Sequence, residues 1–111
     1  MALEGICHCG AIKVSLRFTP AEATECNCSI CRRTGALWTY GAPDEIDVEG
    51  SGIGYIQGDA TLTTWHCGTC GITTHWTPMD PDYGRMGVNL RLFHPEVWKS
   101  LPRKLVDGAS W

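Results

Sequence analysis

The architecture is set by two cysteine motifs, Cys7-His8-Cys9-Gly10 and Cys67-Gly68-Thr69-Cys70-Gly71, which lie far apart in the sequence. In each motif a glycine follows the last cysteine, and glycine permits the positive φ that turns backbone N–H groups toward a metal-bound sulfur. This pattern is typical of a zinc knuckle, and two knuckles supply the four thiolates of a closed, structural Zn²⁺ site. Other pairings of the cysteines also fit the sequence, but the shared glycine favours this one. We therefore predict that the two motifs bind one structural zinc, with Cys7, Cys9, Cys67 and Cys70 as its ligands.

A second group of cysteines, Cys26-Asn27-Cys28-Ser29-Ile30-Cys31, is a trio without an obvious fourth thiol. Three protein ligands and one exchangeable position are what a catalytic zinc requires. Zn²⁺ with three thiolates carries a net charge of −1, which the following Arg32 and Arg33 can offset. Alternatively, an aspartate or a histidine closes the site and makes it structural, the candidate histidines being His8, His66, His75 and His94.

Composition excludes several classes of protein. The chain has 111 residues, 43% hydrophobic and 19% charged, which fits one globular domain over residues 1–111. The net charge of −3 argues against nonspecific nucleic-acid binding, and no apolar run is long enough for a membrane helix. Oligomeric state cannot be read from the sequence.

The number of cysteines also bears on the compartment. Seven is odd, so a complete disulfide framework would leave one thiol over. Residues 1–4, Met-Ala-Leu-Glu, show neither the basic head nor the apolar run of a secretory signal. We therefore expect a reducing, cytoplasmic location, where clustered cysteines bind metal more often than they form disulfides. Redox dithiols and inert buried thiols are the alternatives.

The remaining sequence predicts a mostly β fold of short antiparallel strands. Ile12, Val14, Leu16 and Phe18 alternate with polar residues, as in a half-buried strand. Pro95 begins one short helix, which Pro102 ends near Leu101. The acidic stretch 44–49 is interpreted as a solvated loop. Further strands are expected over 36–42, 54–57, 62–66, 72–77 and 86–93.

The three cysteine motifs, together with Gly5-Ile6 before the first and the ending Val106-Asp107-Gly108-Ala109-Ser110-Trp111, resemble the glutathione-dependent formaldehyde-activating enzyme family, which includes centromere protein V-like proteins. The resemblance implies a zinc-bound β-tent fold with two zinc ions per chain. It also implies that the zinc at Cys26, Cys28 and Cys31 takes part in carbon–sulfur chemistry on glutathione and formaldehyde. Asn27 stands where the family commonly has histidine, and a residue between two chelating cysteines should point away from the metal.

The resulting hypothesis is a zinc-dependent carbon–sulfur lyase or synthase resembling S-(hydroxymethyl)glutathione synthase. Its partners would be a small thiol such as glutathione and a small carbonyl, with no nucleic acid and no membrane. Cys26, Cys28 and Cys31 would form the catalytic centre. The alternatives are a non-catalytic zinc-dependent interaction module, expected if a protein side chain fills the fourth position, and a redox protein. The candidate substrate-binding residues are Arg32 and Arg33 for carboxylates, and Trp38 and Tyr40 as pocket walls.

Overall fold

The computed structural model describes residues 3–110 and contains two β-sheets. The smaller sheet has the strand order β1-β2-β5, and both of its pairings are antiparallel. Its strands are β1 (Leu3–Ile6), β2 (Lys13–Leu16) and β5 (Ile46–Glu49).

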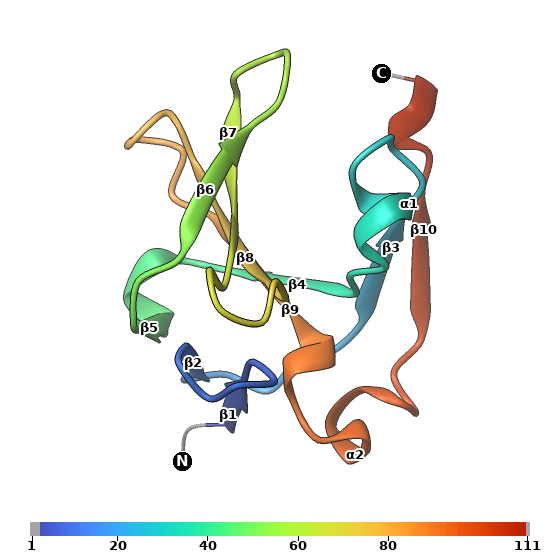
Figure 1. Cartoon of the computed structure of the whole chain (residues 1–111). Helices are drawn as coiled ribbons and strands as arrows, with labels where there is room; N and C mark the ends of the chain where they lie inside the picture. Colours follow the sequence, from blue (N-terminus) through green and yellow to red (C-terminus); the bar gives the residue numbers. More distant parts are fainter. Residues whose placement is uncertain (1–2, 111) are drawn as a thin grey trace.

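The larger sheet has seven strands in the order β10-β3-β4-β9-β8-β7-β6. Neighbouring strands run antiparallel, apart from β10 and β3, which are parallel. Its two edges diverge in Figure 1, with the β6–β7 hairpin on one side and β3, β10 and α1 on the other. Its strands are β3 (Ala23–Cys26), β4 (Trp38–Gly41), β6 (Ile53–Ile56), β7 (Leu62–His66), β8 (Thr73–Pro78), β9 (Met86–Asn89) and β10 (Arg103–Val106).

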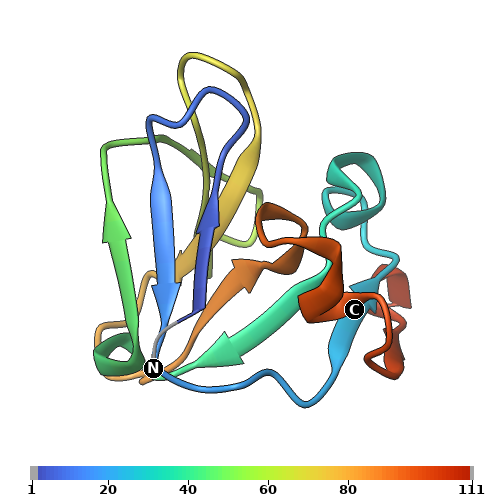
Figure 2. The same cartoon turned by 90° about the horizontal axis from the view of Figure 1, so that it is seen from below.

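The hydrophobic core joins the two sheets. Val14 and Leu16 of β2 are fully buried, as the alternating pattern predicts, and they belong to one cluster with Val88 of β9. The smaller sheet is seen from below in Figure 2, where β1 and β2 lie beside the strands of the larger sheet. The predicted mostly β fold is confirmed, and among the described strands the β3–β10 pair departs from the antiparallel expectation because it is parallel.

The helices are short: α1 (Cys31–Thr34), α2 (Pro95–Trp98) and the 3₁₀ turns η1 (Pro43–Glu45), η2 (Leu90–Leu92) and η3 (Gly108–Ser110). Pro95 begins α2 as predicted, but the helix ends at Trp98, and α1 is a second helix that the sequence analysis did not predict. None of the described helices is long and apolar enough to cross a membrane.

The predicted loop over residues 44–49 is wrong. These residues form the end of η1 and the strand β5, which pairs with β2. Ile46 is buried and Val48 half-buried, whereas Asp47 and Glu49 are exposed. The acidic residues therefore occupy the solvent side of a strand whose other side faces the core.

Candidate metal centres

The first cysteine cluster is built by two hairpin turns with the same backbone pattern. Cys7 N–H donates to the carbonyl of Ile12 between β1 and β2, and Cys67 N–H donates to the carbonyl of Ile72 between β7 and β8, both at 3.0 Å. Gly10 has φ 86° and Gly71 has φ 79°. Both glycines therefore adopt the left-handed conformation that the sequence analysis predicted for a knuckle.

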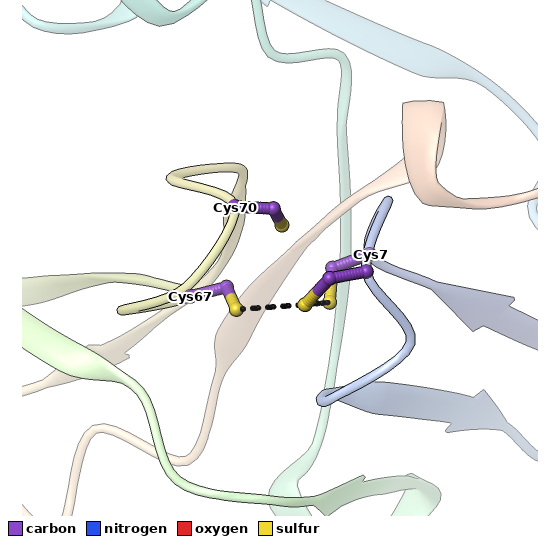
Figure 3. A group of neighbouring side chains, drawn as sticks. Cys7, Cys67 and Cys70 are labelled. Atoms are coloured by element: carbon purple, nitrogen blue, oxygen red, sulfur yellow. Dashed lines mark hydrogen bonds between the residues drawn. The ribbon is translucent and has the colours of Figure 1, made fainter.

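The two turns bring Cys7, Cys9, Cys67 and Cys70 together, with all four sulfurs within 4.8 Å of one another. In Figure 3, Cys67 and Cys70 project from one turn toward Cys7 on the other. The Sγ atom of Cys9 lies 3.5 Å from that of Cys67 and 3.7 Å from that of Cys7. A tetrahedral site with metal–sulfur bonds of about 2.3 Å has sulfur–sulfur edges of about 3.8 Å. The four thiols therefore fit one metal ion.

Backbone N–H groups surround these sulfurs. Ile12 N–H donates to Cys7 Sγ at 3.3 Å, and Thr69 N–H donates to Cys67 Sγ at 3.4 Å. Such hydrogen bonds stabilise thiolates and orient them toward a metal.

The pKa values of neighbouring thiols in this cluster are shifted in opposite directions. Hydrogen bonds from the backbone of Ile72 and Cys9 lower the pKa of Cys70 to about 6. A backbone hydrogen bond from Ala11 acts to lower the pKa of Cys9, but contacts with the Cys67 and Cys7 thiols and partial desolvation of its sulfur outweigh this effect and raise the pKa to about 11. Four thiolates this close repel one another, and a bound cation removes that repulsion.

The first cluster is part of the core. Cys7 and Cys67 are each 2% exposed and belong to the core cluster, and Cys70 packs against it. Cys7 follows a strand of the smaller sheet, whereas Cys67 follows a strand of the larger one. A metal held here would join the two sheets.

The second cluster lies at the other end of the larger sheet. Cys26 ends β3, Cys28 lies in the following loop, and Cys31 begins α1. Their sulfurs lie within 4.8 Å of one another, and among residues 3–110 no fourth cysteine, histidine, aspartate or glutamate joins them. All three are partly exposed, unlike Cys7 and Cys67. The predicted trio is thus brought together, and it could hold a metal ion with one position left for another ligand.

Two hydrogen bonds fix this trio. Cys31 N–H donates to Cys28 Sγ, and Trp38 Nε1–H donates to Cys31 Sγ, both at 3.4 Å. Burial raises the pKa of Cys31 to about 12, helped by the neighbouring Cys28 thiol. Burial also acts to raise the pKa of Cys28, but hydrogen bonds from the backbone and side chain of Cys31 lower it overall.

The histidines considered as a fourth ligand make other contacts or lie elsewhere. His75 is buried, stacks on Trp65 and shares a hydrogen bond with Thr74. His94 accepts a hydrogen bond from the backbone of Glu96 at the start of α2. His8 is exposed in the first turn, and His66 is half-buried at the end of β7.

A groove of about 590 Å³ opens beside Cys26 and Cys31. Of the two arginines predicted to bind substrate, Arg32 lines this groove, whereas the guanidinium of Arg33 donates to the carbonyl of Ser29 at 2.8 Å and Arg33 is not among the lining residues. The other lining residues come from β3 and the loop after it, the segment between α1 and β4, η2, and β10 and the residue after it: Glu25, Asn27, Gly35, Ala36, Leu37, Arg91, Leu105, Val106 and Asp107.

Arg91 is a groove residue that the sequence analysis missed. It reaches the groove from η2, where its Nε donates to the carbonyl of Gly35 at 2.8 Å and its guanidinium lies 5.2 Å from the centre of the Trp98 ring. No cysteine lies near it in the sequence, so only the fold reveals its position.

The two aromatic candidates, Trp38 and Tyr40, are not among the residues that line this groove. Trp38 is buried and contacts the second cluster through its indole N–H. Tyr40 is half-buried with Arg85 over its ring at 4.1 Å, and it lines a separate hollow of about 370 Å³ with Phe18 and Thr24. Burial raises the pKa of Tyr40, which keeps its phenol protonated.

The fold and its thiols define a class: a small β-rich domain with a four-thiol centre in its core and a three-thiol centre beside a groove. The family model described as glutathione-dependent formaldehyde-activating enzyme matches residues 2–100. The chain belongs to this family, as the cysteine motifs predicted.

Comparison with solved structures supports the same architecture. A crystal structure of a Rhodobacter sphaeroides protein, a structural genomics target, superimposes with a TM-score of 0.76 at 31% sequence identity. The match covers 92% of this chain and 100% of the other. No curated protein matches the chain.

Proposed function

We propose that the chain is a zinc-dependent carbon–sulfur lyase or synthase that joins the thiol of glutathione to formaldehyde or a related small carbonyl. The observation that carries the proposal is the three-thiol cluster, which opens on a groove lined by two arginines. Family membership supports a function connected with glutathione and formaldehyde. A reducing compartment such as the cytoplasm suits a protein with seven free thiols.

Both clusters suit zinc. Cys7, Cys9, Cys67 and Cys70 offer a closed set of four sulfurs, whereas Cys26, Cys28 and Cys31 offer three. When bound at the second cluster, zinc would hold an incoming thiol as a thiolate. We therefore assign a structural role to the first cluster and the reaction centre to the second.

The groove offers charged partners for glutathione, which carries two carboxylates. Arg32 and Arg91 reach the groove from different segments and can each bind one carboxylate through charge-assisted hydrogen bonds. Glu25 and Asp107 also line the groove and can face the ammonium group of the tripeptide. The arginines also offset the net charge of −1 of zinc with three thiolates. Trp38 donates to Cys31 Sγ and so reduces the charge on that sulfur.

In the forward reaction, a carbon–sulfur bond forms between the glutathione sulfur and the carbonyl carbon. The π electrons of the carbonyl move to its oxygen, which takes up the proton that the thiol has lost. The reverse reaction breaks the same bond and restores both reactants. A free thiol with a pKa near 8.5 is only about 3% thiolate at pH 7, so complete ionisation gains at most about thirty-fold. The remaining acceleration comes from orientation of the two reactants in the groove.

A non-catalytic interaction module is the second candidate function. It would be favoured by a fourth protein ligand at the second cluster, and residues 3–110 provide none of the usual kinds. An exchangeable fourth position agrees better with an enzyme.

A titration of cobalt-substituted protein tests the proposal. Glutathione should strengthen the thiolate-to-cobalt charge-transfer absorption and bind more tightly than S-methyl glutathione, because a thioether cannot supply an anionic sulfur. Arg32→Ala and Arg91→Ala should each weaken glutathione binding by roughly ten- to a hundred-fold, since a charge-assisted hydrogen bond contributes about 1.5–3 kcal/mol. Arg33→Ala is the matched control and should change little. Equal affinities for the two peptides, or no spectral change, would refute the thiol-binding mechanism.

A further inference from the structure

The last described residues of the chain pack directly against the second cluster. Strand β10 lies parallel to β3, so that Val106 aligns with Cys26, and Asn27 N–H donates to the carbonyl of Val106 at 3.1 Å. In Figure 1 the red end of the chain follows β10 upward past β3 and α1. The parallel pairing thereby delivers residues 107–110, which we name the C-terminal turn, to the loop that carries Cys26 and Cys28.

Gly108 is the point of closest approach. It is buried, and a Cβ atom added to it would lie 2.6 Å from Cys26 Sγ and 3.1 Å from Cys28 Cβ. Both distances are shorter than an ordinary van der Waals contact, so only a hydrogen atom fits between the turn and the two cysteines.

Asn27 fastens the turn to the same loop. Its Nδ2 donates to Asp107 Oδ1 at 3.0 Å, and its Oδ1 accepts from the backbone N–H of Ala109 at 2.9 Å. Asp107 also accepts a hydrogen bond from Ser110 Oγ at 2.5 Å, and the pKa of its carboxyl is lowered by these bonds from Ser110 and Asn27. The side chain between the two cysteines is therefore used to hold the C-terminal turn.

We propose that the C-terminal turn positions the Cys26–Cys28 loop for metal binding, with Gly108 and Asn27 as its positioning residues. This inference rests on the proposed function to the extent that the trio must hold a metal. The backbone of Gly108 lies against Cys26 and limits the rotation of its side chain, and the hydrogen bonds of Asn27 hold the C-terminal turn in that position. Residues that orient metal ligands in this way typically change metal affinity by 10–100-fold when they are replaced.

The structure also explains why the effect should be confined to the second centre. Without metal, Cys26 Sγ can turn about the Cα–Cβ bond away from an added methyl group, and Cys28 Cβ, at 3.1 Å, needs to shift by only a few tenths of an ångström, so we expect the fold to accommodate Gly108→Ala. With metal, the same sulfur is fixed by coordination and cannot move. The first centre belongs to two other hairpins and shares none of these contacts.

Cobalt titration of reduced, metal-free protein tests this inference. The spectrum of the second centre is assigned by its absence from Cys28→Ser, and metal content is measured independently. Gly108→Ala should bind the second equivalent of cobalt 10–100-fold more weakly and with an altered ligand-field spectrum, while the first equivalent is unaffected. Gly58→Ala is the matched control, because no described atom lies within 4 Å of its added Cβ. Asn27→Ala should reproduce the defect of Gly108→Ala without adding any atom.

The outcomes separate this inference from the proposed function. If the wild-type protein binds two equivalents and both variants bind the second one as tightly, the positioning role is refuted while the proposed function stands. If the wild type binds one equivalent with Cys26, Cys28 and Cys31 reduced, both proposals are refuted. If Gly108→Ala fails to fold, Asn27→Ala decides, and its wild-type affinity for the second equivalent would overturn the inference.

Discussion

Serine substitutions at one ligand of each centre should separate a structural metal from a functional one. Cys70→Ser and Cys28→Ser form a matched pair, because both side chains are half-buried. The change in side-chain burial is therefore similar, and the difference in stability between the variants reports what a metal ion at each centre contributes. We expect Cys70→Ser to lower the free energy of unfolding more strongly.

The expected magnitude follows from the chain spans that a metal ion in each centre would close. In the first centre Cys9 and Cys67 are 58 positions apart, and the loop-closure relation for a cross-link gives about 4 kcal/mol at this length. In the second centre Cys26 and Cys31 are only five positions apart, which gives about 2 kcal/mol. The difference of about 2 kcal/mol corresponds to roughly 10 °C in Tm for a domain of this size.

Thermal melts of the reduced, zinc-loaded variants, followed by circular dichroism, measure this difference. Removal of metal from the native protein with a strong chelator should lower Tm at least as far as Cys70→Ser does. Equal losses of Tm in the two variants, or a larger loss in Cys28→Ser, would refute the division into a structural and a functional centre.

Two further predictions concern Trp38 and His75. Trp38→Phe removes the hydrogen bond to Cys31 Sγ, so the charge-transfer band of the cobalt-substituted second centre should shift to lower energy. The first centre should keep its spectrum, and an unshifted band of the second centre would contradict a role for Trp38. Burial lowers the pKa of His75 from 6.5 to about 4, so between these pH values the unfolded state binds a proton that the folded state does not. The free energy of unfolding should therefore fall by up to about 3 kcal/mol as the pH decreases from 6.5 to about 4. In His75→Gln that part of the decrease should be absent from denaturant unfolding curves, and an identical pH dependence in the variant would contradict it.

The cysteine groupings could be predicted from the sequence because each motif carries its own local geometry. The glycine after Cys9 and the glycine after Cys70 both adopt positive φ, and the same local constraint made their pairing predictable. Strand β5 carried a usable signal as well, since Ile46 and Val48 alternate with acidic residues, but the concentration of charge suggested a loop instead. The alternation was the better guide, because the buried face of a strand needs only every second residue.

Other parts of the site depend on contacts between distant segments. Strand β10 is mostly exposed, and its two basic residues precede two apolar ones without alternation. Its pairing with β3 is parallel, so no turn sequence indicates it. Gly108 reaches the second centre through this pairing, and Arg91 reaches the neighbouring groove from η2. Both residues are far from Cys31 in the sequence. The sequence placed Arg33 beside the cysteines, but α1 directs its side chain back to Ser29.

The buried amide of Asn89 links the start of strand β8 to the groove and explains how Arg91 is placed. Asn89 is 5% exposed, and its Nδ2 donates to the carbonyl of Thr73, at the start of the strand that leaves the first centre. Its Oδ1 accepts from the backbone N–H groups of Leu37 and Arg91, both of which line the groove. A buried polar group left without a partner costs about 1–3 kcal/mol, so loss of the Asn89 side chain would leave the groups that it now bonds unsatisfied. The arrangement in which all three hydrogen bonds form is therefore favoured. The position of Arg91 in the groove is thus tied to the strand that the first centre anchors, so a metal bound in the core would help to shape the groove at the far end of the sheet.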